Sequence, residues 1–172
     1  MEIYVVRHGE TEAGKNKIIA DTEENLNNNG IKQAKNIGKE LAKLNIDAVY
    51  CSPIERAKHT LKLFNLNNIP TIVEERLKER DMGIYENVKF DMLDWEEFWG
   101  YNSEKKYSEL ESMKSVYKRV SSFLDELRVK EKNKKILLVT HGGVARAIYW
   151  YFNGFDNSLF KCENCKIYKY SI

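Results

Sequence analysis

The sequence predicts an α/β fold, a three-layer α/β/α sandwich around a mainly parallel central sheet. Short apolar runs rich in β-branched residues alternate with longer segments whose apolar residues recur at helical spacing, and this alternation is typical of such folds. Two of the apolar runs also end alike, each on a histidine followed by a glycine, at His8 and at His141. Because the carboxyl ends of parallel strands meet at one edge of a sheet, we expect the two histidines to lie together there.

The first half of the chain supplies predicted strands and helices in alternation. The first strand passes into a long loop, rich in Asn, Asp and Glu, that runs to Asn29. The second strand is followed by Ser52-Pro53, which indicates the start of a helix, because serine is a preferred N-cap and proline suits the first helical position. The predicted strands span about 2–7, 47–51 and 71–73, and the predicted helices span about 30–44 and 52–64.

The second half begins with the least regular part of the chain, 74–107, where Phe, Trp and Tyr stand in a charged background. Helical spacing returns after this segment, and an apolar run then leads into a further helix. The end of the chain is predicted to pair at an edge of the sheet. These later elements are expected over about 108–128 (helix), 136–140 (strand), 143–152 (helix) and 166–171 (strand).

Length and charge limit the kinds of function to consider. The 172 residues are enough for one domain, 1–172, with a buried core. The 28 basic and 26 acidic residues are interspersed, so no basic face for nucleic acid or a membrane surface is expected. No apolar run approaches the roughly 20 residues that span a bilayer, and the N-terminus has no signal-peptide pattern. We therefore expect a cytoplasmic protein; the sequence leaves its oligomeric state open.

The three cysteines do not predict a disulfide framework or a metal site. Cys162 and Cys165 form a C-x-x-C pair, but a structural zinc site needs four ligands and no second pair is near in the sequence. A thioredoxin-like pair would open a helix, whereas this one lies between strand-like segments. We expect reduced thiols in or near a terminal turn, and a small buried residue at Cys51.

Residues suited to phosphate binding surround the predicted meeting point of the two histidines. Arg7 offers a permanently charged fork for a phosphate or a carboxylate. Arg56 falls in the first turn of a helix, where anions are favoured, and Gly142-Gly143 permits close backbone approach at another helix start. Each of these residues has a structural explanation when taken singly, but together they describe a phosphate pocket. The third histidine, His59, is expected on a helix surface or in packing.

Five groups of residues form an ordered set of motifs along the chain. They are Arg7-His8-Gly9-Glu10-Thr11; Leu26, Gly30, Gln33 and Ala34; Ser52-Pro53, Arg56-Ala57 and Thr60; Leu77-Lys78-Glu79, Gly83, Tyr85 and Glu86; and Thr140-His141-Gly142-Gly143. In this order they resemble the motifs of the histidine phosphatase superfamily, which includes cofactor-dependent phosphoglycerate mutases and small phosphatases of the α-ribazole-phosphate and broad-specificity kinds. One match alone would be weak, but the whole set is specific. The resemblance implies a phosphoglycerate mutase-like fold and runs from residue 3 to about residue 150.

The resemblance assigns a role to each residue of the predicted pocket. His8 would be the nucleophile that forms a phosphohistidine intermediate, and it must attack through an unprotonated ring nitrogen. Arg7, Arg56 and His141 would hold the equatorial phosphate oxygens, with the backbone at Gly142 nearby. No metal ion and no cofactor is implied, because the arginines and the imidazole supply the positive field.

The resemblance also selects one carboxylate from a charged run, 74–81. Glu79 would protonate the departing alkoxide and later accept a proton from the attacking water. Composition alone does not distinguish it from its neighbours, because such runs are usually solvated; Asp81 and Glu86 are the alternatives. Arg80 matches a substrate-contact position of the mutase branch.

One position departs from the family pattern. The first motif often continues to an asparagine three residues beyond Thr11, and here that residue is Gly14. Asn16 lies close by and is expected to take its place in phosphate binding if the loop shifts. The departure concerns the positioning of the phosphate and not the nucleophile.

Hydrolysis of small phosphomonoesters is the function that we expect, with water as the phosphoryl acceptor. A phosphoglycerate mutase would need more chain to exclude water than the insertion 87–107 provides. This aromatic segment would be either a lid over the organic half of the substrate or a cap on the core. Protein phosphohistidine phosphatases typically lack the glutamate matched by Glu79, and a non-catalytic phosphate-binding protein would show degraded motifs.

Overall fold

The computed structural model describes residues 1–155 and 160–172, and its centre is a five-stranded sheet in the order β3-β2-β4-β1-β5. Neighbouring strands are parallel except for the antiparallel pair of β1 and β5 at one edge. The predicted fold class and the predicted terminal edge strand are therefore confirmed. The strands are β1 (Glu2–Arg7), β2 (Ala48–Cys51), β3 (Thr71–Val73), β4 (Lys135–Thr140) and β5 (Ile167–Ser171).

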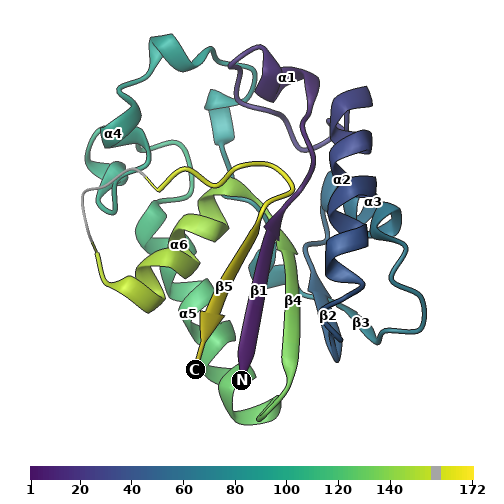
Figure 1. Cartoon of the computed structure of the whole chain (residues 1–172). Helices are drawn as coiled ribbons and strands as arrows, with labels where there is room; N and C mark the ends of the chain where they lie inside the picture. The colour runs from purple at the N-terminus through teal and green to yellow at the C-terminus, as the bar shows by residue number, and fades with distance from the viewer. Residues whose placement is uncertain (156–159) are drawn as a thin grey trace.

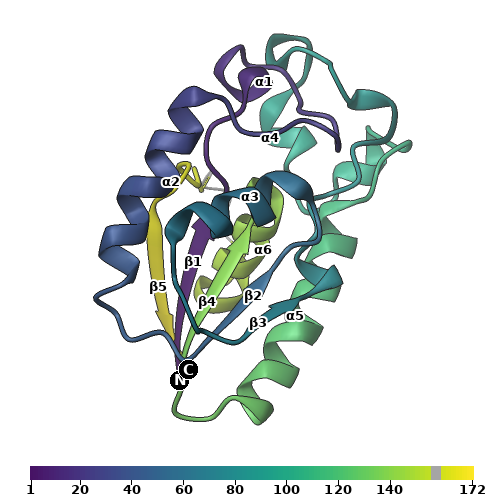
Figure 2. The same ribbon diagram turned by 90° about the vertical axis from the view of Figure 1, so that its right-hand side faces the viewer.

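Helices cover both faces of the sheet and complete the three layers (Figures 1 and 2). α2 (Asn28–Leu41) and α3 (Glu55–Phe64) lie on one face, and α5 (Met113–Lys130) and α6 (Gly142–Asn153) lie on the other. Within the described residues, no helix is long and apolar enough to cross a membrane. The short helices are α1 (Glu12–Lys15) and α4 (Trp95–Phe98), with 3₁₀ turns η1 (Glu75–Leu77), η2 (Gly83–Tyr85), η3 (Phe90–Met92) and η4 (Ser103–Lys105).

The central strands β1 and β4 each contain an unbroken apolar run, residues 3–6 and 136–139, because both of their faces are covered. On β1, Ile3 and Val5 join the cluster under α5 and α6, whereas Tyr4 and Val6 join the cluster under α2 and α3. β4 divides in the same way, and its residues Ile136–Val139 are fully buried. This double burial fixes the register of β1 and β4, so that their carboxyl ends stop level with each other, Arg7 opposite Thr140.

Two helix starts differ from the sequence-based expectation. α3 begins at Glu55 with Ile54 as its N-cap residue, so the prediction of Ser52 as N-cap was wrong. The Ser52 hydroxyl instead accepts a hydrogen bond from the Ile54 N–H at 3.2 Å and lies 2.7 Å from His141 Nε2, which holds it in the turn before the helix. α5 begins at Met113, later than residue 108, because the Ser112 side chain caps it.

The aromatic insertion 87–107 is partly core. Phe98 and Tyr107 are buried in the cluster under α5 and α6, and Trp99 is buried beside them. The segment crosses above the carboxyl ends of the strands, where Figure 1 shows α4 on the same side of the molecule as α1. It therefore both extends the core and lies on the side of the sheet where the motifs gather.

Candidate active site

The ends of β1 and β4 bring the two strand-end histidines together, as the sequence predicts. The His8 N–H donates to the carbonyl of Thr140 at 2.9 Å, which extends the β1–β4 ladder by one bond. The imidazole rings of His8 and His141 lie 5.1 Å apart between centroids, with their planes inclined by 56°. Two motifs separated by more than a hundred residues thus form one site through the register of the sheet.

The hydrogen bonding of His8 fixes which ring nitrogen is free. Nδ1 lies 2.8 Å from the carbonyl oxygen of Gly9, and because a carbonyl only accepts, Nδ1 carries the proton. Nε2 is then left with an unprotonated lone pair. Burial, followed by the charges of Arg7 and Arg56, holds the pKa of His8 well below its ordinary value. The ring is therefore neutral at neutral pH and can act as a nucleophile through Nε2.

His141 is fully buried behind the same site. Its Nε2 lies 2.7 Å from Ser52 Oγ, whereas its Nδ1 is buried with no hydrogen-bond partner among the described residues. Burial lowers the pKa of His141, and the neighbouring His8, Arg56 and Arg7 lower it further. A buried ring nitrogen without a partner is costly unless a ligand completes it.

Two arginines reach the site from different elements. Arg7 ends β1 and donates through Nη1 to the carbonyl of Cys162 at 2.9 Å. Arg56 is almost fully buried in the first turn of α3 and donates through Nη1 to the carbonyl of Asp21 at 2.8 Å. In each arginine Nε is buried without a partner in the described chain. Each guanidinium group is therefore held in place by Nη1, and its Nε–H remains available to donate to a ligand.

A tightly packed turn after β1 joins the first two motifs. Thr60 Oγ1 accepts from the Gly9 N–H at 3.1 Å and donates to the carbonyl of Arg56 at 2.7 Å. Gly9 must be a glycine, because a Cβ there would lie 2.5 Å from the carbonyl oxygen of Gly30 at the start of α2. These contacts explain why a threonine and two glycines accompany the charged residues of the motifs.

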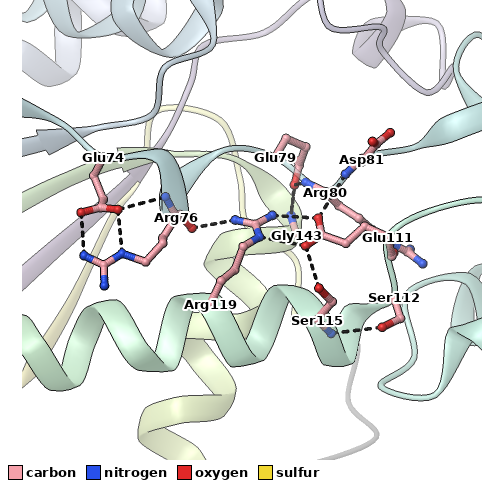
Figure 3. A network of polar contacts seen from close by, with 10 residues as sticks. All are labelled: Glu74, Arg76, Glu79, Arg80, Asp81, Glu111, Ser112, Ser115, Arg119 and Gly143. Atoms are coloured by element: carbon pink, nitrogen blue, oxygen red, sulfur yellow. Dashed lines mark hydrogen bonds and ion pairs between the residues drawn. The ribbon is translucent and has the colours of Figure 1, made fainter.

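Glu79 contacts the start of α6 and shares a cavity with His8. Its Oε1 accepts from the Arg80 N–H at 2.9 Å and from the Gly143 N–H at 3.1 Å (Figure 3). The Gly143 N–H can approach only because no Cβ is present, since a Cβ there would lie 2.7 Å from Glu79 Oε1. The Thr140 hydroxyl holds the preceding backbone by donating to the carbonyl of Leu77 at 2.8 Å.

The two alternative carboxylates lie outside the site. Asp81 is exposed, and its Oδ1 accepts from the Gly83 N–H at 3.0 Å in a local turn. Glu86 accepts from the Thr22 hydroxyl at 3.2 Å. Neither of them lines the cavity that contains His8, whereas Glu79 does. The geometry therefore favours Glu79 as the carboxylate of this site.

The structure does not bring two further sequence-predicted residues to the histidines. The guanidinium of Arg80 is buried among Glu111 O, Phe98 O and Ser103 Oγ, each of which accepts from it. Asn16 is exposed and donates back to the carbonyl of Glu12 at 2.9 Å. Neither side chain lines the cavity around His8, although Gly14 does.

The cavity in front of His8 has a volume of about 610 Å³. Arg7, Arg56, Glu79 and Gly142 line it together with His8. The lining also contains aromatic and cationic side chains, and the sequence had indicated only the aromatic ones of the segment 87–107. These further lining residues are Phe90, Trp95, Trp99 and Phe160, with Lys17, Arg146 and Lys161.

A C-terminal loop supports the ends of β1, and sequence reasoning missed its role. Asn164 Nδ2 donates to the carbonyl of His8 at 2.8 Å, and the Cys165 N–H donates to the carbonyl of Arg7 at 3.0 Å. Cys162 and Cys165 are free thiols, as predicted; both are also buried, and burial raises the pKa of each to about 12. The only sequence signal was an asparagine inside the C-x-x-C pair.

The described residues contain no group of three or more His, Cys, Asp or Glu side chains placed to hold a metal ion. The third histidine, His59, is half-buried on α3, and its Nδ1 lies 2.9 Å from Asn25 Oδ1. It does not join the two strand-end histidines, which agrees with the expected helix-surface position.

Known proteins share this sequence pattern and fold over nearly the whole chain. The histidine phosphatase superfamily (branch 1) matches residues 3–172. Phosphoserine phosphatase 1 of Hydrogenobacter thermophilus is 30% identical over 182 aligned positions that cover 100% of this chain and 85% of that protein. The metal-independent phosphoserine phosphatase of Arabidopsis thaliana is 34% identical and covers 86% of this chain and 67% of its own length. A phosphoserine phosphatase mutant from Entamoeba histolytica, solved with phosphoserine, superposes with a TM-score of 0.81 at 27% identity, covering 98% and 89% of the two chains.

Proposed function

This chain belongs to branch 1 of the histidine phosphatase superfamily and is a phosphoric monoester hydrolase, and on that premise we propose that it hydrolyses small phosphomonoesters through a phosphohistidine at His8. His8 Nε2 attacks phosphorus, so that an N–P bond forms while the ester P–O bond breaks. Water then attacks the phosphohistidine, the N–P bond breaks, and inorganic phosphate leaves.

The observation that carries this proposal is the set of unpartnered buried polar atoms around His8. Arg7 Nε, Arg56 Nε and His141 Nδ1 have no hydrogen-bond partner within the described residues. Buried polar groups in native proteins nearly always have partners, and the two arginine Nε groups can only donate, so three exceptions in one site indicate a ligand with several oxygens. A phosphoryl group offers three equatorial oxygens, and its transition state spreads negative charge over them. The two guanidinium groups supply the compensating positive charge.

Glu79 handles the protons in this scheme. In the first step it donates a proton to the leaving alkoxide, and in the second it removes one from the attacking water. Its place beside Gly143, on the cavity wall with His8, supports this role. The Gly143 and Arg80 N–H groups fix the orientation of the carboxylate.

The cavity supports small substrates with a polar organic half. About 610 Å³ lies within the usual range for small-molecule sites. Phe90, Trp95 and Trp99 of the insertion 87–107 line the cavity and would cover the substrate. Phe98 and Tyr107 of the same insertion belong to the core. Lys17 and Lys161 line the cavity as well and favour an anionic group at the far end of the substrate. Phosphoserine is the first substrate to test, because two relatives are phosphoserine phosphatases.

The test measures phosphate release from phosphoserine, 3-phosphoglycerate and p-nitrophenyl phosphate in the presence of a chelator. Wild type, His8→Ala and Glu79→Gln are compared, and thermal melting confirms that each variant is folded. We expect chelator-resistant release that disappears in His8→Ala. Glu79→Gln should slow the alkyl esters far more than the aryl ester, because a phenolate departs without much help from an acid.

Three outcomes would contradict the proposal. Full activity in His8→Ala would remove His8 as the nucleophile. Isomerisation of 3-phosphoglycerate without phosphate release would indicate a mutase. Absence of turnover with every ester would favour a protein substrate or a binding role.

A further inference from the structure

We infer that Glu111 and Arg119 form a positioning unit that holds the Glu79 segment in its working place. The inference rests on the proposed acid–base role of Glu79 and extends it to two residues that lie outside every motif of the family resemblance. Neither residue lines the cavity around His8. Any effect on turnover would therefore be indirect, through the segment that they hold.

The segment that carries Glu79 has no regular structure of its own. It lies between η1, which ends at Leu77, and η2, which begins at Gly83. No helix or strand hydrogen bonding fixes its backbone, so its conformation depends on contacts with other parts of the chain. On one side those contacts come from Thr140 and Gly143, which belong to the site itself.

On the other side, Glu111 holds the two residues that follow Glu79. The Glu111 N–H donates to the carbonyl of Asp81 at 2.9 Å, and the Asp81 N–H donates to Glu111 Oε2 at 3.3 Å. The carbonyl of Glu111 accepts from Arg80 Nε at 2.5 Å. Backbone donor, backbone acceptor and side chain of this one residue are all used to hold Arg80 and Asp81. Figure 3 shows the contact between the Glu111 carboxylate and the Asp81 N–H.

Arg119 connects this contact to the residues that precede Glu79. From α5 its guanidinium grips the Glu111 carboxylate with both arms, Nε to Oε1 at 2.9 Å and Nη2 to Oε2 at 3.0 Å. The remaining Nη1 donates to the carbonyl of Arg76 at 2.6 Å. Figure 3 shows Arg119 reaching from its helix between Arg76 and Glu111. One side chain thus ties down the chain before Glu79 and, through Glu111, the chain after it.

The geometry of this pair suits a rigid support better than a surface ion pair. The two side chains are only 21% and 19% exposed, and the two-armed contact fixes their relative orientation. Burial is the largest single influence on Glu111 and raises its pKa, but the hydrogen bonds and charge of Arg119, together with the hydrogen bonds from the Asp81 N–H and Ser115, lower the pKa overall, so the carboxylate stays charged. Ser115 Oγ adds a further donor to Glu111 Oε1 at 3.1 Å.

The experiment separates positioning of Glu79 from general stability by using the leaving group. Turnover of phosphoserine needs an acid, whereas turnover of p-nitrophenyl phosphate needs little acid help. Glu111→Gln and Arg119→Met should lower kcat for the alkyl ester about tenfold more than for the aryl ester, because small misplacements of a catalytic group are costly. Arg119→Lys keeps the charge but not the two-armed contact, and its effect should be intermediate.

Two comparisons make the result specific. In a Glu79→Gln background, Glu111→Gln should cause no further change in the alkyl-to-aryl ratio, because the acid whose position it controls is already absent. Glu131→Gln is the matched control, since Glu131 is also buried and pairs with Lys134 and with the Tyr50 hydroxyl at 2.8 Å, near the far end of α5. It should lower the melting temperature without changing the ratio.

The inference is overturned if Glu111→Gln or Arg119→Lys lowers both substrates equally, as a loss of folded protein would, or leaves the ratio unchanged. It is also overturned if the effects on the ratio simply add in the double variant. Failure of the proposed function itself would be recognised separately, as wild-type turnover that survives His8→Ala.

Discussion

Replacing Gly143 by alanine tests the contact between the start of α6 and Glu79. The added Cβ would lie 2.7 Å from Glu79 Oε1 and 3.0 Å from Trp99 Cζ3, both closer than the ordinary contact range that begins at 3.4 Å. The indole is buried and cannot easily move. The carboxylate is the end of a flexible side chain, so it should yield first. The mutation therefore displaces the proposed acid while leaving the backbone of the helix in place.

The contact distances set the expected magnitude. Restoring ordinary contact from 2.7 Å to 3.4 Å requires Glu79 to withdraw by about 0.7 Å. A misplacement of about 1 Å can cost roughly a hundredfold in rate, so kcat for an alkyl phosphate should fall by about tenfold to a hundredfold. This corresponds to about 1.4–2.7 kcal/mol in the activation free energy. Stability should change by less than about 1 kcal/mol, because alanine also favours the helix.

The assay compares kcat for phosphoserine and p-nitrophenyl phosphate, together with thermal melting. Gly142→Ala controls for helix propensity in the melting comparison only, because a Cβ there meets Arg7 Cζ at an ordinary 3.7 Å but Gly142 itself lines the cavity. An equal loss on both substrates in Gly143→Ala would refute the reasoning. So would full alkyl turnover, since the carboxylate would then have tolerated the displacement or played no part.

Two further predictions concern the histidines. Asn164→Asp keeps the shape of the side chain but removes the donor to the His8 carbonyl, so kcat should fall by about tenfold with KM little changed. Steady-state kinetics measure both constants, and a change in KM alone would contradict the prediction. The pKa values of His8 and His141 are lowered by burial, so below about pH 6.5 the unfolded chain binds protons that the folded chain does not. The free energy of unfolding should therefore be fully retained above pH 6.5. As the pH drops below 6.5, it should decrease by about 1.4 kcal/mol per pH unit for each histidine, and urea unfolding at pH 7.5, 6.5 and 5.5 measures this slope. His8→Gln should halve the slope, and a flat profile in wild type would show that the pKa values of the two histidines are not lowered.

Much of the fold followed from local patterns. The β-branched runs at β1 and β4 and the periodic segments at α2, α5 and α6 are readable because burial on both faces of a sheet, or on one face of a helix, leaves a period in the sequence. The helix starts were less accurate. Ser52 looks like an N-cap in sequence, yet its hydroxyl lies against His141, a residue 89 positions away. A capping residue with a distant competing partner has no local signature.

The irregular regions were the least readable. Arg80 was expected to contact the substrate, but its guanidinium donates hydrogen bonds to Glu111 O, Phe98 O and Ser103 Oγ. These acceptors are far away in the sequence, so the sequence does not show that they use the donors of Arg80. The aromatic insertion divides between core and cavity wall, and hydrophobicity alone does not separate the two, since both need large apolar side chains.

The sequence by itself determined which side chains gather at the candidate site, because the identities of His8, His141, Arg7 and Arg56 and their places at strand and helix ends follow from short local motifs. Only the tertiary structure decided which ring nitrogen of His8 is free, which carboxylate of the charged run faces the cavity, and which residues hold both in place. The physical reason is that tautomer, orientation and support are set by hydrogen bonds to carbonyls and N–H groups far away in the chain. Backbone groups are the same in every residue, so the sequence does not mark the ones that a fold will use.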